Sequence, residues 1–200
     1  MPRKLDPDKA LKQWQVAGSA LPAVAQAVLE AGPEAAVFYA DESRIELLPL
    51  IRASWHWIGS QIRIPTPGTN DGRTIFGALN IRTGHWSYLM RQSLRKEDFI
   101  AFLEHLLVEY PNGRVLLIVD NFSSHKANLV RDWLKANERL SLHFLPTYCS
   151  DLNPVERIWL QLKNQVAANR LYVSMDVLID TVNSFFAKMT LDQALVWASV

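Results

Sequence analysis

Residues 145–159 read Leu-Pro-Thr-Tyr-Cys-Ser-Asp-Leu-Asn-Pro-Val-Glu-Arg-Ile-Trp, and this stretch decides how the rest of the chain is interpreted. A short apolar strand is predicted before it, and a helix is predicted to begin within it. Asn153 is a good N-cap because its side-chain oxygen can accept an amide hydrogen of the first turn, and Pro154 suits the first helical position. Glu156 then falls in the first turn. On this motif alone, Glu156 either completes a capping box and favours the helix dipole or has a chemical role.

Two further carboxylates follow apolar stretches upstream. A buried strand is predicted over Ala35–Ala40 and ends at Asp41, and a continuous aliphatic strand over Arg114–Val119 ends at Asp120. An uninterrupted apolar run is typical of a strand buried on both faces. Each Asp by itself is explained equally well as a turn or cap residue. Three acids that follow three elements in this order make coincidence a much weaker explanation.

The pattern of the whole chain predicts the α/β class, with a mixed sheet and flanking helices. Helical periodicity covers 6–31, 95–110, 126–136, 154–165, 177–189 and 191–197. Strand composition covers 45–49, 53–58, 74–81 and 86–90, with turn signals at 65–68 and 70–72, and predicts antiparallel hairpins. Ligands in open α/β sheets gather at the carboxyl ends of strands. We therefore expect Asp41, Asp120 and Glu156 to meet at one edge of the sheet.

Length and composition exclude several classes of protein. The chain has 200 residues, 49% of them apolar and 20% charged, which is typical of one globular domain. A single cysteine excludes an internal disulfide and a multi-cysteine zinc site. No apolar run approaches the ~20 residues of a membrane span, and no signal-peptide pattern opens the chain. We expect no membrane partner and, as the default, a cytoplasmic or nucleoid location.

Three carboxylates at one sheet edge would repel one another unless a cation lies between them. Oxygen ligands without nearby thiolates favour Mg²⁺ or Mn²⁺ over zinc. Two such ions about 3.5–4 Å apart form the usual clamp for phosphodiester chemistry. Asp41, Asp120 and Glu156 are therefore the predicted catalytic and metal-binding residues. Asp41 and Asp120 are expected to hold the pair of ions, and Glu156 to complete one site.

Three segments of the chain carry a resemblance to a known family: Asp41-Glu42-Ser43-Arg44, Asp120-Asn121 with His125, and the stretch 145–159. They are similar to the catalytic core of transposases of the mariner superfamily, in its bacterial insertion-sequence branch. The resemblance covers residues 36–165. Thirty-five residues separate Asp120 from Glu156, which is similar to the spacing in that family's acid triad.

The resemblance implies a ribonuclease H-like fold and a DDE triad of Asp41, Asp120 and Glu156. It also implies metal-dependent hydrolysis of DNA phosphodiesters followed by strand transfer, which is cut-and-paste DNA transposition, typically into TA targets. The implied partners are DNA, as element ends and as target, and a second copy of the chain in a homodimeric active complex. The alternative is a non-catalytic DNA-binding or assembly remnant of a decayed insertion element.

The chain departs from the family pattern in the turn before the helix and at its amino-terminal end. Thr147 stands where a second proline is common, and Cys149-Ser150 replaces Ser-Pro. Residues 1–34 are predicted to be a helical lead-in, 35–170 the catalytic core, and 171–200 closing helices of the same domain. Family members carry paired helix-turn-helix modules ahead of the core, and the lead-in is too short for them. We expect those modules in a separate protein or reading frame, or else lost or removed.

Several other side chains are candidates for supporting roles. Asn121, His125 and Asn153 are predicted to support the acids or contact a phosphate, against the simpler alternatives of shaping turns and capping helices. Glu42 follows Asp41 on a strand, so it should point to the opposite face and is not expected to be a ligand. Trp159 is expected to pack and fix the helix that carries Glu156.

Basic residues outnumber acids in the strand region. From Arg44 to Lys96 there are eight Lys or Arg against two acids, which indicates either an ordinary solvated face or a phosphate-contacting surface. The candidates for weak, salt-sensitive DNA binding are Arg44, Arg52, Arg63, Arg73 and Arg91. Trp55 and Trp57 share one face of a predicted strand, where core packing is favoured over base stacking.

Overall fold

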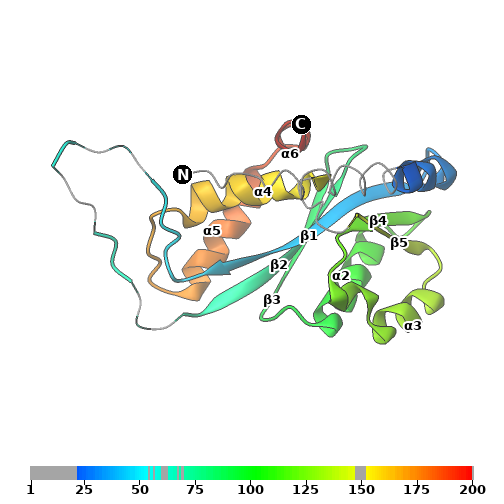
Figure 1. Cartoon of the computed structure of the whole chain (residues 1–200), viewed down its shortest axis with the longest axis horizontal. Coiled ribbons are helices and arrows are strands. Elements are labelled where there is room, and N and C mark those ends of the chain that lie inside the picture. Colours follow the sequence, from blue (N-terminus) through cyan, green and yellow to red (C-terminus); the bar gives the residue numbers. More distant parts are fainter. Residues whose placement is uncertain are drawn as a thin grey trace, which may run out of the picture.

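A five-stranded mixed sheet forms the centre of the protein, in the strand order β3-β2-β1-β4-β5 (Figure 1). The computed structural model describes residues 22–53, 55, 57–59, 63–66, 68, 70–146 and 152–199. The strands are β1 (Ala36–Glu46), β2 (Gly72–Asn80), β3 (Trp86–Arg91), β4 (Val115–Val119) and β5 (Leu140–Phe144). β1, β2 and β3 pair antiparallel, whereas β4 pairs parallel with both β1 and β5. The expected α/β mixed sheet is confirmed.

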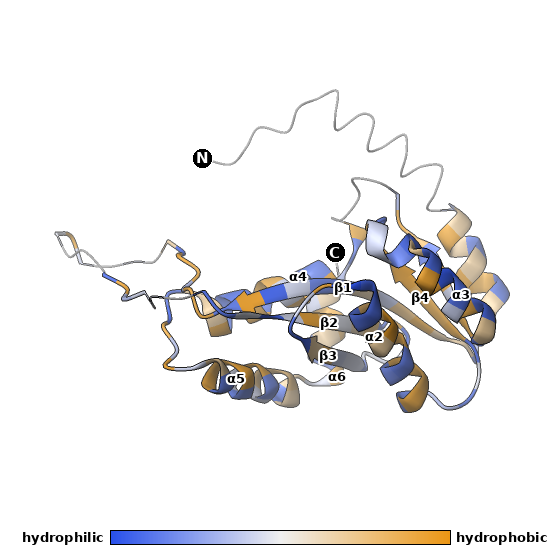
Figure 2. Cartoon of the chain, turned by 90° about the horizontal axis from the view of Figure 1, so that it is seen from below, coloured by the Kyte–Doolittle hydropathy of each residue, from blue (hydrophilic) through white to orange (hydrophobic). Residues whose placement is uncertain are grey.

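Helices cover both faces of this sheet. One face carries α2 (Lys96–Glu109) and α3 (Asn128–Ala136), and the other carries α4 (Val155–Leu162), α5 (Met175–Lys188) and α6 (Leu191–Ala198). Figure 2 shows hydrophobic and hydrophilic residues interspersed on α2 and α5, as expected for helices with one face on a sheet. A further helix spans 22–31, and the rest of the predicted lead-in lies outside the described residues. No helix in the described ranges is long and apolar enough to cross a membrane.

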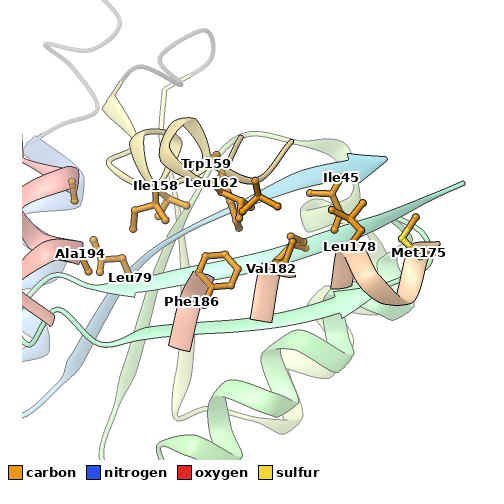
Figure 3. Close-up of a cluster of buried hydrophobic side chains, with 14 residues drawn as sticks. Ile45, Leu79, Ile158, Trp159, Leu162, Met175, Leu178, Val182, Phe186 and Ala194 are labelled. Atoms are coloured by element: carbon orange, nitrogen blue, oxygen red, sulfur yellow. The ribbon is translucent and has the colours of Figure 1, made fainter. Parts of the chain in front are cut away.

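The alternation of side chains along the strands divides the core into two layers. Phe38 and Ala40 of β1 belong to the cluster under α2 and α3, whereas Ile45 belongs to the cluster under α4, α5 and α6. Figure 3 shows the second cluster, to which Trp159 and Phe186 both belong. Because successive residues of a strand face opposite sides, Asp41 faces the α4 layer and Glu42 faces the α2 layer.

The first strand differs from its prediction, which ended it at Asp41. β1 continues to Glu46, and its antiparallel pairing with β2 runs as far as Glu46 opposite Gly72. Its parallel pairing with β4 stops at Tyr39 opposite Ile118. Asp41 therefore lies in the middle of a strand but just beyond the last β1–β4 pair, where the two strands separate. The predicted strand at 45–49 overlaps this element only at 45–46, and residues 47–49 form no strand.

The segment that joins β1 to β2 also differs from prediction. The described residues of 53–58 form no strand. Trp55 is 102% exposed and Trp57 is 89% exposed, so the prediction that these indoles pack in the core is wrong. Apolar residues do not form a stable strand unless a neighbouring strand pairs with their backbone groups. The apolar composition of this segment therefore does not indicate a buried strand.

Gly77 of β2 provides a test of how the two layers fit together. It lies opposite Asp41 in the β1–β2 register, and a Cβ added there would lie 2.4 Å from the Trp86 ring and 2.7 Å from the Trp159 ring. These two rings pack edge to face with their centroids 5.2 Å apart. We expect Gly77→Ala to lower the free energy of unfolding by about 1–3 kcal/mol through overpacking, measured by urea denaturation. Gly68→Ala, where an added Cβ meets nothing within 4 Å, is the control and should leave the midpoint unchanged.

Candidate active site

Asp41 lies under the helix that carries Glu156 and has a strongly perturbed carboxyl group. Its Oδ2 accepts a hydrogen bond from Trp159 Nε1 at 3.0 Å. Burial, followed by the negative charges of Glu156 and Glu42, raises the pKa of Asp41 to about 8. A buried carboxyl group with carboxylate neighbours and no cation beside it favours the protonated form. Trp159 thus holds this acid in addition to packing, which sequence reasoning had not predicted.

Asp120 follows β4 directly and is fixed by the start of the next turn. Its Oδ1 accepts the backbone N–H of Phe122 at 2.9 Å and lies 3.3 Å from His125 Nδ1. The hydrogen bond with His125 is the main reason that the pKa of Asp120 lies below its usual value. The charge of Asp120 also contributes to raising the pKa of Asp41. The two aspartates are therefore close enough to interact, but the pKa of Asp41 is raised whereas that of Asp120 is lowered.

Glu156 lies in the first turn of α4 and is exposed. The helix begins one residue later than predicted, at Val155, but Asn153 still accepts a first-turn hydrogen bond, from Val155 N at 3.1 Å. The Asn153 amide also donates to the backbone oxygen of Ala40 at 2.9 Å. This buried contact ties the helix start to the residue before Asp41. Asn153 therefore fixes the position of Glu156 relative to Asp41.

A buried ion pair supports the site from the other face of the sheet. His125 is 2% exposed, and its Nε2 lies 2.8 Å from Glu42 Oε1. Burial alone would lower the pKa of His125, but hydrogen bonds with Asp120 and Glu42 outweigh it and raise the pKa to about 9. The Phe99 ring covers the imidazole, with ring centroids 4.3 Å apart. His125 thus links Asp120 to Glu42, a residue that sequence reasoning had set aside.

The structure gives different surroundings to the remaining candidates, which are Asn121 and the five predicted DNA-binding arginines. Asn121 donates to the backbone oxygen of Leu145 and accepts from Lys126, so it shapes the loop after β4. Arg44 pairs with Glu46 at 2.9 Å and Arg73 with Asp71 at 2.8 Å. The arginines at 63 and 91 are exposed and are not among the lining residues of the groove described beside Glu156. Of the five predicted arginines, Arg52 is the one that shares a groove with Glu156.

The donor set fits a hard divalent cation, although the side chains are not gathered around one point. Among the described residues, no three His, Cys, Asp or Glu side chains are arranged to hold a metal ion. The Trp159 indole holds one oxygen of Asp41, and Phe122 N–H holds one of Asp120. Burial is the main reason that the pKa of Asp41 is raised, and the repulsion from Glu156, Glu42 and Asp120 that adds to it is what a cation would relieve.

Comparison with known proteins identifies the family. The sequence profile of the DDE superfamily endonucleases matches residues 36–179. The chain belongs to the DDE superfamily of endonucleases. It is 36% identical over 164 residues to the "Insertion element IS630 uncharacterized 39 kDa protein" of Shigella sonnei, covering 82% of this chain and 48% of that protein. The chain thus spans about half the length of this relative.

Solved structures share the fold of this DDE domain. The Mos1 transposase paired-end complex with left transposon end matches with a TM-score of 0.68 at 16% identity, covering 99% of this chain and 60% of that one. The catalytic domain of Mos1 mariner transposase matches with a TM-score of 0.61 at 15% identity, covering 99% and 90%. The predicted ribonuclease H-like fold and the predicted DDE type of the domain are confirmed. The chain is similar in sequence to the IS630 protein and in fold to Mos1 transposase.

The perturbed carboxyl group of this DDE domain leads to a prediction about pH. The pKa of Asp41 is higher in the folded state than the model-peptide value of 3.8, so between these values the folded state holds a proton that the unfolded state releases. Ionising Asp41 therefore lowers the free energy of unfolding progressively as pH rises from about 4, and this loss reaches its full size above about 8. In EDTA, Asp41→Asn should gain stability relative to the wild type across this range.

The measurement is a series of thermal scans in EDTA between about pH 6 and about pH 9. The melting temperature of Asp41→Asn minus that of the wild type should increase with pH. Added Mn²⁺ should raise the melting temperature of the wild type, most at high pH, because binding then displaces no proton. If the difference in melting temperature between the two proteins did not change with pH, the pKa of Asp41 would not be raised.

Proposed function

We propose that this DDE domain catalyses metal-dependent hydrolysis of DNA phosphodiesters and the strand transfer that follows. The observation that supports this most is the electrostatic coupling of three acids from three elements. Burial is the main reason that the pKa of Asp41 on β1 is raised, and the charges of Glu156 at the start of α4, of Glu42, and of Asp120 after β4 raise it further. Carboxylates that repel one another in the absence of a cation are typical of a site that binds cations and, through them, phosphates.

The residues of the chain have separate roles in this proposal. Asp41 and Asp120 would hold divalent ions, and Glu156 would complete the site from the groove. When bound, Mg²⁺ or Mn²⁺ supplies charge neutralisation for the attacking and leaving oxygens. Matches to Mos1 paired-end complexes with Mg and with Mn support this choice of ion. Trp159 and His125 keep the two aspartates in place, which is the positioning that phosphoryl-transfer chemistry requires.

The proposed reaction has two balanced steps. In the first, a water oxygen forms a bond to the phosphorus at the element end and the bond from phosphorus to the 3′ oxygen breaks. The products are a 5′ phosphate, which keeps the water oxygen, and a 3′ hydroxyl, whose oxygen receives one proton of the water by way of solvent. In the second step, that 3′ hydroxyl attacks a target phosphodiester and releases a target 3′ hydroxyl. We further propose that a homodimer holds the two element ends.

The test is nicking of supercoiled plasmid by the purified chain with Mg²⁺, with Mn²⁺, and with EDTA. A labelled duplex with a free 3′ hydroxyl assays strand transfer separately. Nicking that requires the metal and the three acids is expected. The alternative, a DNA-binding or assembly remnant, predicts DNA binding without metal-dependent nicking. Binding without cleavage in both assays would therefore favour the remnant over the enzyme.

A further inference from the structure

A groove lies beside Glu156 and is lined by positive charge. Its lining residues are Arg52, Asn153, Glu156, Arg157, Trp159, Leu160 and Lys163. Lys163 directly follows α4, about two turns after Glu156, so the two residues lie on similar faces, separated by about 10 Å along the axis. By the ~3.4 Å axial rise per nucleotide of B-DNA, that length corresponds to roughly three nucleotides. The groove therefore extends away from the acid on the scale of a short DNA segment.

The two cations at the end of this groove have no partner within the described protein. Other arginines bond to backbone or acidic groups: Arg82 to the oxygens of Gly32, Pro33 and Ala35, and Arg139 to those of Tyr110, Pro111 and Gly113. No hydrogen bond or ion pair joins the Arg52 guanidinium or the Lys163 ammonium to a described residue. Arg157 donates to the Ser199 backbone oxygen at 3.2 Å.

The backbone of Arg52 is held by a specific clasp. Asn169 Oδ1 accepts from Arg52 N at 2.9 Å, and Asn169 Nδ2 donates to Arg52 O at 2.9 Å. Asn169 also donates its backbone N–H to Leu50 O at 2.9 Å. Asn169 has φ +54°, the one positive value at a non-glycine residue in the described part of the chain. Asparagine tolerates this left-handed conformation better than other side chains, and strained residues persist where their surroundings hold them.

The clasp follows an unusual turn at the end of α4. Residues Lys163–Ala167 form a π-helix, a widened turn that is uncommon and occurs often at functional sites. It ends where Leu50 and Ala168 form a parallel bridge. The root of the β1–β2 connection is thereby pinned against the end of the helix that carries Glu156. An ordinary surface loop would not need this combination of contacts.

We propose that Arg52 and Lys163 bind a backbone phosphate of the DNA that flanks the scissile position, and that Asn169 positions Arg52 for this contact. The inference rests on the proposed function, since it names where the flanking DNA lies. The contact is with phosphate rather than with bases, because the lining presents charge and no set of amides converges there. Asn169 is a positioning residue that acts through Arg52.

Salt-dependent DNA binding tests the proposal without depending on cleavage. The observable is the affinity of the whole chain for a duplex over a series of salt concentrations, by fluorescence anisotropy in EDTA. Arg52→Ala and Lys163→Ala should each weaken binding about 5–10-fold and reduce the slope of log K against log salt by about 0.9, one phosphate contact. Arg52→Lys should restore most of the slope. Arg114→Ala, at the amino end of β4 and also exposed, is the matched control and should change neither.

The clasp is tested by a double-mutant cycle. Asn169→Gly permits the positive φ but removes both side-chain hydrogen bonds to Arg52, so any effect comes from the clasp rather than from backbone strain. It should weaken binding by a factor of about 3–5, and the double variant with Arg52→Ala should bind no more weakly than Arg52→Ala alone. Strictly additive losses would overturn the positioning role of Asn169.

The outcomes separate this inference from the proposed function. A wild type that binds DNA without nicking would refute the catalytic proposal and leave the groove contacts measurable. If the wild type nicks DNA but Arg52→Ala and Lys163→Ala behave like Arg114→Ala, the groove assignment is wrong. In a nicking assay, Arg52→Ala should raise KM for the plasmid with little change in kcat, since the contact lies away from the reacting bond.

Discussion

Asp120→Ala is expected to reduce metal-dependent strand cleavage by at least ~1,000-fold, equivalent to about 4 kcal/mol of lost transition-state stabilisation. The reason is that Asp120 is one of the two aspartates proposed to hold a divalent ion, and its carboxylate is kept ionised by His125 and Phe122 N–H. The measurement is the initial rate of plasmid nicking in Mg²⁺ and in Mn²⁺. Asp41→Asn and Glu156→Gln should give losses of similar size.

The fold should survive this substitution, because the Asp120 side chain is 42% exposed. Circular dichroism and a thermal scan check that the variant is folded. Asp132→Ala removes an acid of the same type on α3, where it pairs with Lys135 on the surface, and it should cleave at the wild-type rate. A folded Asp120→Ala protein that nicks as fast as the wild type would disprove the triad assignment.

Trp159→Ala is expected to cause the largest loss of stability, about 3–5 kcal/mol, because it leaves a cavity between the helices and the sheet. The indole is 1% exposed and packs against Trp86 and Phe186 with ring centroids at 5.2 and 6.3 Å. The free energy of unfolding from urea titration measures the loss. Leu160→Ala, at a residue that is 47% exposed on the same helix, should cost far less.

Trp159→Phe separates the packing of this residue from its hydrogen bond. Phenylalanine retains much of the ring volume but cannot donate to Asp41 Oδ2, so the expected loss of stability is smaller, about 1–2 kcal/mol. Its nicking rate should fall even at temperatures where the variant remains folded, because the indole no longer donates a hydrogen bond to Asp41. Equal nicking by Trp159→Phe and the wild type would mean that the indole N–H has no part in placing the acid.

The sequence was sufficient to predict the elements that are set by local periodicity. The aliphatic run before Asp120 is β4, the apolar face at 99–107 is α2, and the Asn-Pro pair starts α4 within one residue of its predicted position. These predictions hold because burial on one or both faces leaves a clear period in the chain. The triad of Asp41, Asp120 and Glu156 stays a prediction, which their electrostatic coupling supports.

Other features depend on contacts between distant segments, and no local pattern encodes them. The ion pair of Glu42 with His125 joins residues 83 positions apart, and the clasp of Asn169 on Arg52 joins residues 117 apart. Strand alternation did indicate that Glu42 faces away from Asp41, but nothing local named its partner. Trp55 and Trp57 were misjudged for the same reason, since hydrophobicity predicts burial only where a second surface is present to cover the side chain.

The placement of two adjacent acids on opposite faces of β1 makes this site unusually sensitive to codon deletions. Removing one residue between Ala36 and Ala40 would shift the strand by one position and turn every later side chain to the other face. Glu42 would then occupy the place of Asp41 under Trp159, and Ser43 would occupy the place of Glu42 beside His125. Drift in this stretch can therefore proceed by substitution but not by change of length.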